Sequence, residues 1–142
     1  MENNNVLGPH SVVFKEGTPA EKLYLVKNGE VLCLKASKDR LIPVFMAKEG
    51  DIIGESAMVQ DLNHTYSAVV PQYAHLIEIP ANDLQTVMEK GPNWLTELAT
   101  TMILRFQNTS NLIAENRVIH PSIIDEDQFT SAIEVEFKKL LS

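Results

Sequence analysis

The chain has 142 residues, 44% of them hydrophobic, and a formal net charge of −7 at pH 7. This length can bury the core of one domain but is too short for two ordinary ones. The acidic balance argues against a nucleic-acid-binding surface, which requires clustered Lys and Arg. The composition therefore predicts a single module with a short tail, and any nucleotide that it binds should be small.

Cys33 is the only cysteine and lies in an apolar strand pattern, so we expect a buried, inert thiol in a reducing compartment. No stretch approaches the ~18 apolar residues of a membrane span, and the first ten residues lack the features of a signal peptide. These observations predict a cytoplasmic protein without membrane contact. His10, His75 and His120 are widely separated, and no nucleophile is paired with a base, so we expect neither a metal site nor catalytic residues.

Residues 12–79 read as short strands separated by glycine corners, which is typical of a β-roll or small barrel. Asn28-Gly29 stands between two apolar runs and predicts a β-hairpin. The side chains expected to face inward around it are Leu23, Leu25, Val31 and Cys33. A last strand over 74–80 ends at Pro80, and a short helix follows until Gly91-Pro92 stops it.

A long helix is predicted over 93–116, with Asn93 as its N-cap. Its apolar residues recur at alternating steps of four and three, as in a heptad. Two interpretations of this stripe are open, a dimer seam and an ordinary core-facing surface. The residues of the stripe are Leu95, Ala99, Met102, Phe106, Thr109 and Ile113.

The remaining residues, 117–142, are predicted to be a linker and the start of a possible C-terminal output domain. Pro121 breaks helical structure, the acidic run at 125–127 favours solvent, and a helical pattern begins shortly after it. We therefore expect one domain over 1–116 and a natural protein that continues past residue 142.

The stretch at 50–70, GDIIGESAMVQDLNHTYSAVV, carries the candidate site. After the turn at Gly50-Asp51, Gly54 opens a helical turn whose first amides have no intrahelical partners and so attract an anion such as a phosphodiester. Glu55 can accept hydrogen bonds from a ribose hydroxyl, and Thr65 and Ser67 add hydroxyl donors. Taken alone, a Gly-Glu pair is common, and most such glutamates are solvated surface groups.

The same stretch resembles the phosphate-binding cassette of the cyclic-nucleotide-binding domain family. Gly54, Glu55 and Ala57 match its Gly-Glu-x-Ala core, and Thr65 matches its small polar residue, while His64 stands where the family usually has an arginine. The resemblance implies a mainly β fold with α, namely a β-roll (a double-stranded β-helix, jelly-roll-like) followed by a short helix and a long dimerisation helix. It also places Ser56 among the ligand-binding residues.

Within the family, the long helix looks closest to that of the bacterial cyclic AMP receptor protein, because Arg105, Gln107, Thr109 and Ser110 occur in the same order and spacing. In those relatives the Thr-Ser pair contacts the adenine amino group and is shared between two subunits. The resemblance therefore implies adenine selectivity and a homodimer. Arg105 and Thr109 lie four residues apart on one helix face, which we expect to cover the roll and to bring Arg105 to the carboxylate of Glu55.

The sequence thus predicts a non-enzymatic, allosteric sensor that binds cyclic AMP, with cyclic GMP and cyclic dinucleotides as other candidate ligands. Signal transduction would end in a C-terminal output, possibly a signalling enzyme. His64 in place of arginine is expected to make binding depend on pH. Two alternatives are a degenerate member of the fold that acts as a dimerisation or docking module, and a small metal-dependent barrel enzyme, which the histidine spacing disfavours.

Overall fold

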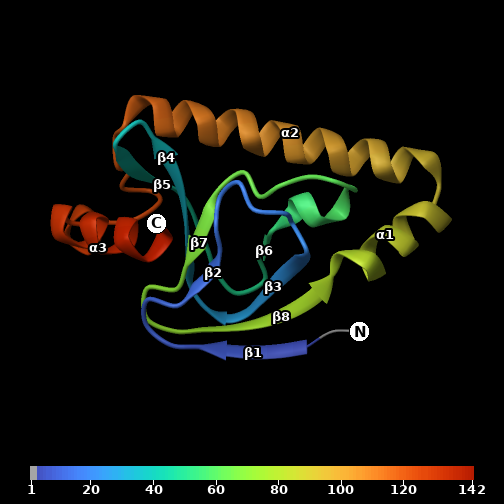
Figure 1. Ribbon diagram of the computed structural model, residues 1–142, viewed down its shortest axis with the longest axis horizontal. Coiled ribbons are helices and arrows are strands. Elements are labelled where there is room, and N and C mark those ends of the chain that lie inside the picture. The colour runs from blue at the N-terminus through green and yellow to red at the C-terminus, as the bar shows by residue number, and fades with distance from the viewer. Residues whose placement is uncertain (1–2) are drawn as a thin grey trace.

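Two four-stranded antiparallel sheets form a roll in the computed structural model, which describes residues 3–142. One sheet, sheet A, has the strand order β1-β8-β3-β6, and the other, sheet B, has the order β2-β7-β4-β5 (Figure 1). This architecture confirms the predicted fold class. The strands are β1 (Asn3–Leu7), β2 (Val12–Phe14), β3 (Lys22–Gly29), β4 (Val31–Ser37), β5 (Arg40–Ala47), β6 (Ile52–Ile53), β7 (Ser67–Val69) and β8 (Ala74–Pro80).

Alternation along the strands decides which side chains enter the roll. On β4, Val31 and Cys33 belong to the inner core, as predicted, and their neighbours point to the outer face of sheet B. On β3 the prediction was wrong, because the inner residues are Tyr24 and Val26 rather than Leu23 and Leu25. The run from Leu23 to Val26 is apolar in both phases, so the hydrophobic pattern alone could not choose between them.

Asn28-Gly29 does not make the predicted hairpin. The strands on either side of it, β3 and β4, belong to different sheets, and the turn is the corner where the chain crosses between them. Gly29 has a φ of 84°, and a Cβ there would lie 2.2 Å from the carbonyl oxygen of Tyr73. The glycine therefore serves a close backbone approach, while the true hairpin joins β4 and β5, where Ser37 pairs with Arg40.

Strand β1 was not predicted from the sequence, because its three asparagines give no apolar alternation. The strand is held by pairing with β8, and the Asn5 side chain donates a 3.0 Å hydrogen bond to Glu78. Strand pairing and a polar cross-strand contact thus hold most of this edge strand, while Leu7 at its end packs against the inner core.

Three α-helices follow the last strand of the roll: α1 (Ala81–Lys90), α2 (Asn93–Asn116) and α3 (Ser131–Leu141). Two short 3₁₀ helices, η1 (Glu55–Met58) and η2 (Glu126–Gln128), complete the elements. The long helix α2 spans the predicted range, although Pro92 rather than Asn93 occupies its N-cap. Over residues 3–142, no helix combines the length and apolar character needed to cross a membrane.

The helix α2 lies across one end of the roll and is apolar on two faces (Figure 1). Phe106 and Ile113 of the predicted seam pack against the inner core, together with the buried Ala114, whereas Met102 is 61% exposed. Thr109 is also exposed. The predicted stripe is therefore not one surface, because about half of it covers the roll and the rest faces solvent.

The C-terminal segment is packed against the roll instead of forming the solvated connector that its proline and acidic run suggested. Its apolar side chains cover the outer face of sheet B, where Leu32, Leu34, Leu41 and Val69 are buried (Figure 1). The acidic residues at 125–127 do stay exposed. The side chains that make the contact are Ile119, Ile123, Ile124, Phe129, Ile133, Phe137, Leu140 and Leu141.

An ion pair fixes α3 to the β4–β5 hairpin. Arg40 donates from Nε (2.9 Å) and from a terminal nitrogen (3.1 Å) to Glu134, and the Leu41 amide donates to the same carboxylate at 3.0 Å. Burial opposes ionisation of Glu134, but these hydrogen bonds outweigh it and lower its pKa. Such a bidentate pair specifies orientation as well as contact, so α3 is held in one register.

We expect Phe137→Ala to lower the free energy of unfolding by about 3 kcal/mol, because the ring is buried against sheet B and its loss leaves a cavity. Urea unfolding of the whole chain measures this. Val135→Ala on the exposed side of the same helix is the matched control. Equal, small effects of the two substitutions would show that α3 is not docked.

Candidate functional site

Gly54 shapes the predicted ligand-binding turn. Its φ is 77°, and a Cβ at this position would approach the carbonyl oxygen of Lys22 to 2.9 Å and the His64 ring to 3.5 Å. Only glycine fits this left-handed, crowded position without strain. The 3₁₀ helix η1 starts immediately afterwards, with Ser56 and Ala57 buried.

Tyr66 is the partner of Glu55, and sequence reasoning missed it. Its hydroxyl donates to Glu55 Oε2 at 2.8 Å and accepts from the Gly54 amide at 2.9 Å. Burial raises the pKa of Glu55, although hydrogen bonds from its own amide and from Tyr66 work against this rise. Burial also raises the pKa of Tyr66 well above its usual value, so the phenol keeps the proton that it donates. The expected pairing of Glu55 with Arg105 is therefore wrong.

A mostly apolar cavity of about 380 Å³ lies between η1 and α2. Glu55 and Tyr66 supply its polar atoms. Tyr66 also meets Phe106 edge to face, with 5.3 Å between the ring centroids, so α2 and the site share one aromatic contact. The apolar lining consists of Phe45, Ile52, Met58, Ala99, Met102, Ile103 and Phe106.

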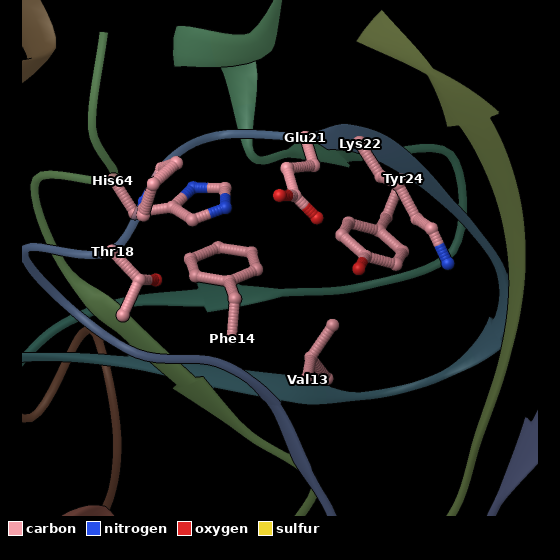
Figure 2. A pocket seen from close by; sticks show the side chains of 8 residues that line it. Val13, Phe14, Thr18, Glu21, Lys22, Tyr24 and His64 are labelled. Carbon is pink, nitrogen blue, oxygen red and sulfur yellow. The ribbon is translucent and has the colours of Figure 1, made fainter.

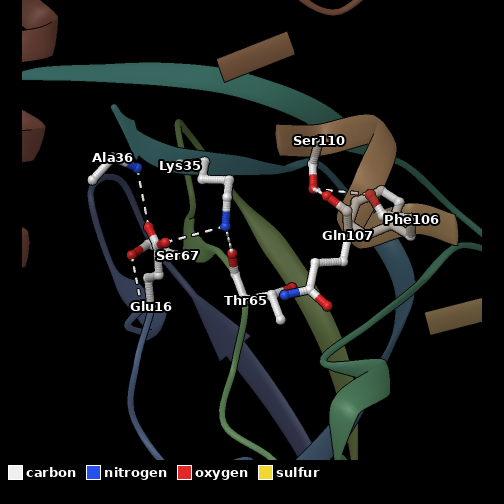
Figure 3. Close-up of polar contacts among 8 residues, drawn as sticks. All are labelled: Glu16, Lys35, Ala36, Thr65, Ser67, Phe106, Gln107 and Ser110. Carbon is white, nitrogen blue, oxygen red and sulfur yellow. Dashed lines mark hydrogen bonds and ion pairs between the residues drawn. The ribbon is translucent and has the colours of Figure 1, made fainter. Parts of the chain in front are cut away.

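A second cavity, of about 490 Å³, shares Ile103 with the first, and its lining mixes apolar side chains with polar ones such as Ser56 and Thr65. It is the more polar of the two and is named the polar cavity. Lys35 lines it too, donating from Nζ to the Thr65 carbonyl (2.6 Å) and to Glu16 (3.2 Å). Figure 3 shows these contacts, with the Gln107 side chain reaching from α2 toward Thr65. The two cavities bring together Glu55, Ser56, His64 and Thr65 of the predicted site under α2.

His64 is buried, with 5% of its surface exposed, and its ring stacks on Phe14 at 3.8 Å between centroids. Figure 2 shows the two rings face to face in a side pocket of about 300 Å³, near Tyr24. Burial lowers the pKa of His64 to about 4, and Nδ1 has no partner within residues 3–142. His64 is thus a neutral imidazole at physiological pH in the folded chain, and the pH dependence of ligand binding expected from it stays a prediction.

The face of α2 that was expected to cover the roll points outward. Arg105 and Thr109 are exposed, and neither lines the two cavities. Ser110 is buried, but its hydroxyl donates back to the carbonyls of Phe106 (2.9 Å) and Gln107 (3.1 Å) of its own helix. Within one chain the structure therefore does not bring these three predicted residues to the ligand cavity.

The fold and site define a ligand-binding β-roll covered by a helix, and the comparisons with known proteins assign its family. The model of the cyclic nucleotide-binding domain matches residues 5–90. The chain belongs to this family of regulatory domains.

Individual relatives are more distant or shorter matches. A cAMP-dependent protein kinase regulatory subunit from Pyricularia oryzae is 43% identical over 61 residues, which are 43% of this chain and 15% of that protein. The cGMP-bound EAL enzyme Bd1971 has a TM-score of 0.68 and 19% identity, over 74% of this chain and 28% of that chain. A putative cyclic nucleotide-binding protein from Geobacter metallireducens has a TM-score of 0.56 and 21% identity, over 78% and 76%. The structural matches show the shared fold.

The buried imidazole should make stability depend on pH. The unfolded chain protonates His64 near pH 6.5 and the folded chain only near pH 4, so the folded state is stabilised above pH 6.5 and loses this contribution between pH 6.5 and 4. We expect wild type to lose about 2 kcal/mol more than His64→Gln between pH 7 and 4.5 in urea unfolding. The exposed His120→Gln is the control; parallel pH profiles for wild type and His64→Gln would contradict the buried neutral state.

Proposed function

We infer that this domain is a cytoplasmic sensor of cyclic AMP, which dimerises along α2 and transmits ligand occupancy to a C-terminal output. The observation that carries the proposal is the pair of cavities under α2, one apolar with a carboxylate and one polar with an ammonium group. A cyclic nucleotide presents the matching chemistry, namely a flat base, a sugar hydroxyl and an anion.

Each part of the ligand has a candidate position. The carboxylate of Glu55 has lone pairs beyond the one that Tyr66 occupies, so it can also accept a ribose hydroxyl. The base fits the apolar lining around Phe106, and the anion fits the polar cavity at Ser56 and Thr65. Because α2 lines both cavities, a ligand that contacts it in only one arrangement of the helix shifts the equilibrium between two states.

The proposed preference for cyclic AMP rests on the similarity to named relatives and on the second subunit of the proposed dimer. The regulatory subunit that is 43% identical over 61 residues is named for a cAMP-dependent kinase. Thr109 faces outward, where it is free to reach the site of a partner chain, and it would then contact the adenine amino group. The EAL enzyme Bd1971, described in cAMP-bound and cGMP-bound forms, supports an enzyme as the output.

We propose that the chain dimerises through the outward face of α2, which differs from the dimer seam predicted from the sequence. Leu98, Met102 and Leu112 are 50%, 61% and 64% exposed. With Arg105 and Thr109 between them they follow steps of four, three, four and three, which is the spacing of a coiled-coil seam. An apolar strip of this kind is well suited to a second copy of the same helix.

Two observations favour a second candidate, a docking module that binds no nucleotide. Tyr66 already provides Glu55 with a hydrogen-bond partner in the absence of a ligand, and His64 offers neither charge nor a donor fork to a phosphate. In this case the roll would serve only to present α2 and α3 to protein partners.

Calorimetric titration with cyclic AMP, cyclic GMP and cyclic di-GMP separates the two candidates. The sensor should bind cyclic AMP most tightly and gain thermal stability with ligand concentration. Absence of both heat and a thermal shift at millimolar nucleotide would favour the docking module.

We expect Glu55→Ala to weaken cyclic AMP binding at least tenfold, because a half-buried carboxylate that accepts a hydroxyl contributes about 1.5–3 kcal/mol. Circular dichroism checks that the variant is folded. Glu49→Ala, which removes an exposed charge, should leave the affinity unchanged. An unchanged dissociation constant in folded Glu55→Ala would remove Glu55 from the site.

The paired substitution of Leu98 and Leu112 by Glu should give folded monomers in sedimentation at tens of micromolar, because both side chains face outward and their loss opens no cavity. Phe106→Glu should instead destabilise the roll that it packs against. A wild-type chain that is monomeric at this concentration would rule out the seam.

A further inference from the structure

The cavities beneath α2 contain one cationic group, Lys35 of β4, which was not among the predicted site residues. Of the described residues that line the two cavities, only Lys35 and His64 can carry a positive charge, and His64 is neutral in the folded chain. Arg105 is exposed and lines neither cavity. An anion that enters this space must otherwise be stabilised without a counter-charge, which is costly away from water.

Lys35 is held in position by the fold. It lies two residues beyond Cys33 on β4, so it continues the inward-facing row of that strand into the polar cavity. Its side chain is 13% exposed. The Thr65 carbonyl and the Glu16 carboxylate accept two of the three ammonium hydrogens, and the remaining hydrogen has no acceptor among residues 3–142 (Figure 3).

We propose that Lys35 binds the anionic group of the ligand, in exchange for part of its contact with Glu16. This proposal rests on the proposed function, because it assumes that the occupant of the cavities is a cyclic nucleotide. The exposed fraction of Glu16 is 30%, so this carboxylate has access to solvent when the ligand takes its place. The Thr65 carbonyl keeps the ammonium group at the mouth of the polar cavity throughout.

The test compares a charged and an uncharged ligand on the full chain. Lys35→Met keeps the length of the side chain and removes its charge, so it should weaken cyclic AMP binding by about ten- to a hundredfold. It should leave binding of adenosine, which lacks the phosphate, within about threefold. Lys27→Met removes an exposed lysine of β3 that lines neither cavity, and it should change neither affinity.

Glu16→Gln is the complementary variant, and it keeps the proposal falsifiable if Lys35→Met fails to fold. It removes the competing charge, so it should tighten cyclic AMP binding severalfold without affecting adenosine. Unchanged cyclic AMP affinity in either variant, or equal losses for both ligands in Lys35→Met, would overturn the role of Lys35. A wild-type chain that binds no cyclic nucleotide would overturn the proposed function itself, and this inference with it.

Discussion

The hydroxyl of Tyr66 joins the parts of the site that the backbone alone leaves separate. It accepts from the amide of Gly54 and donates to Glu55, so it fixes a left-handed glycine and orients a half-buried carboxylate at once. Its ring then carries this arrangement to Phe106 on α2. A rotation of Tyr66 would therefore remove a hydrogen bond from both an amide and a carboxylate, and the turn, the acid and the covering helix are coupled through one side chain.

The helix α2 has two apolar faces with different roles. Its inner face closes the roll through Ile103, Phe106 and Ala114, and its outer face presents Leu98 and Leu112 to solvent. Met102 lies between the two faces, because it is largely exposed and also lines the apolar cavity. A movement of the helix relative to the roll would change the cavities on one side and the exposed strip on the other. If the proposed dimer forms through the outer face, ligand binding and subunit association would influence each other, and thermodynamic linkage requires any such influence to be reciprocal.

Local patterns predicted the elements better than their partners. The length and end signals of α2 were sufficient to place it over 93–116, and the cassette at Gly54 located the turn that begins η1. The pairing of strands was not readable, because Asn28-Gly29 has the composition of a hairpin but sits where two sheets meet. Both phases of β3 and both faces of α2 are apolar, so periodicity could not say which side is inside.

The residues of the candidate site were likewise predicted only in part. Glu55 and Thr65, which line the cavities, could be predicted because their neighbours form a recognisable motif, whereas the contacts of Tyr66 and Lys35 join segments that are distant in the sequence. His64 stands where the resemblance implies an arginine, and its burial against Phe14 reveals that the imidazole is uncharged. Burial is a property of the folded chain that spacing in the sequence does not encode.

The packing of α3 also shows that the region matched by the family model is shorter than the region whose side chains pack together. The match ends at residue 90, yet the outer face of sheet B is covered by residues 119–141. A chain shortened to the matched region would present Leu32, Leu34, Leu41 and Val69 to water as one apolar surface. Such a surface favours self-association, so a fragment cut at the family boundary would aggregate even though every residue of its cassette is intact.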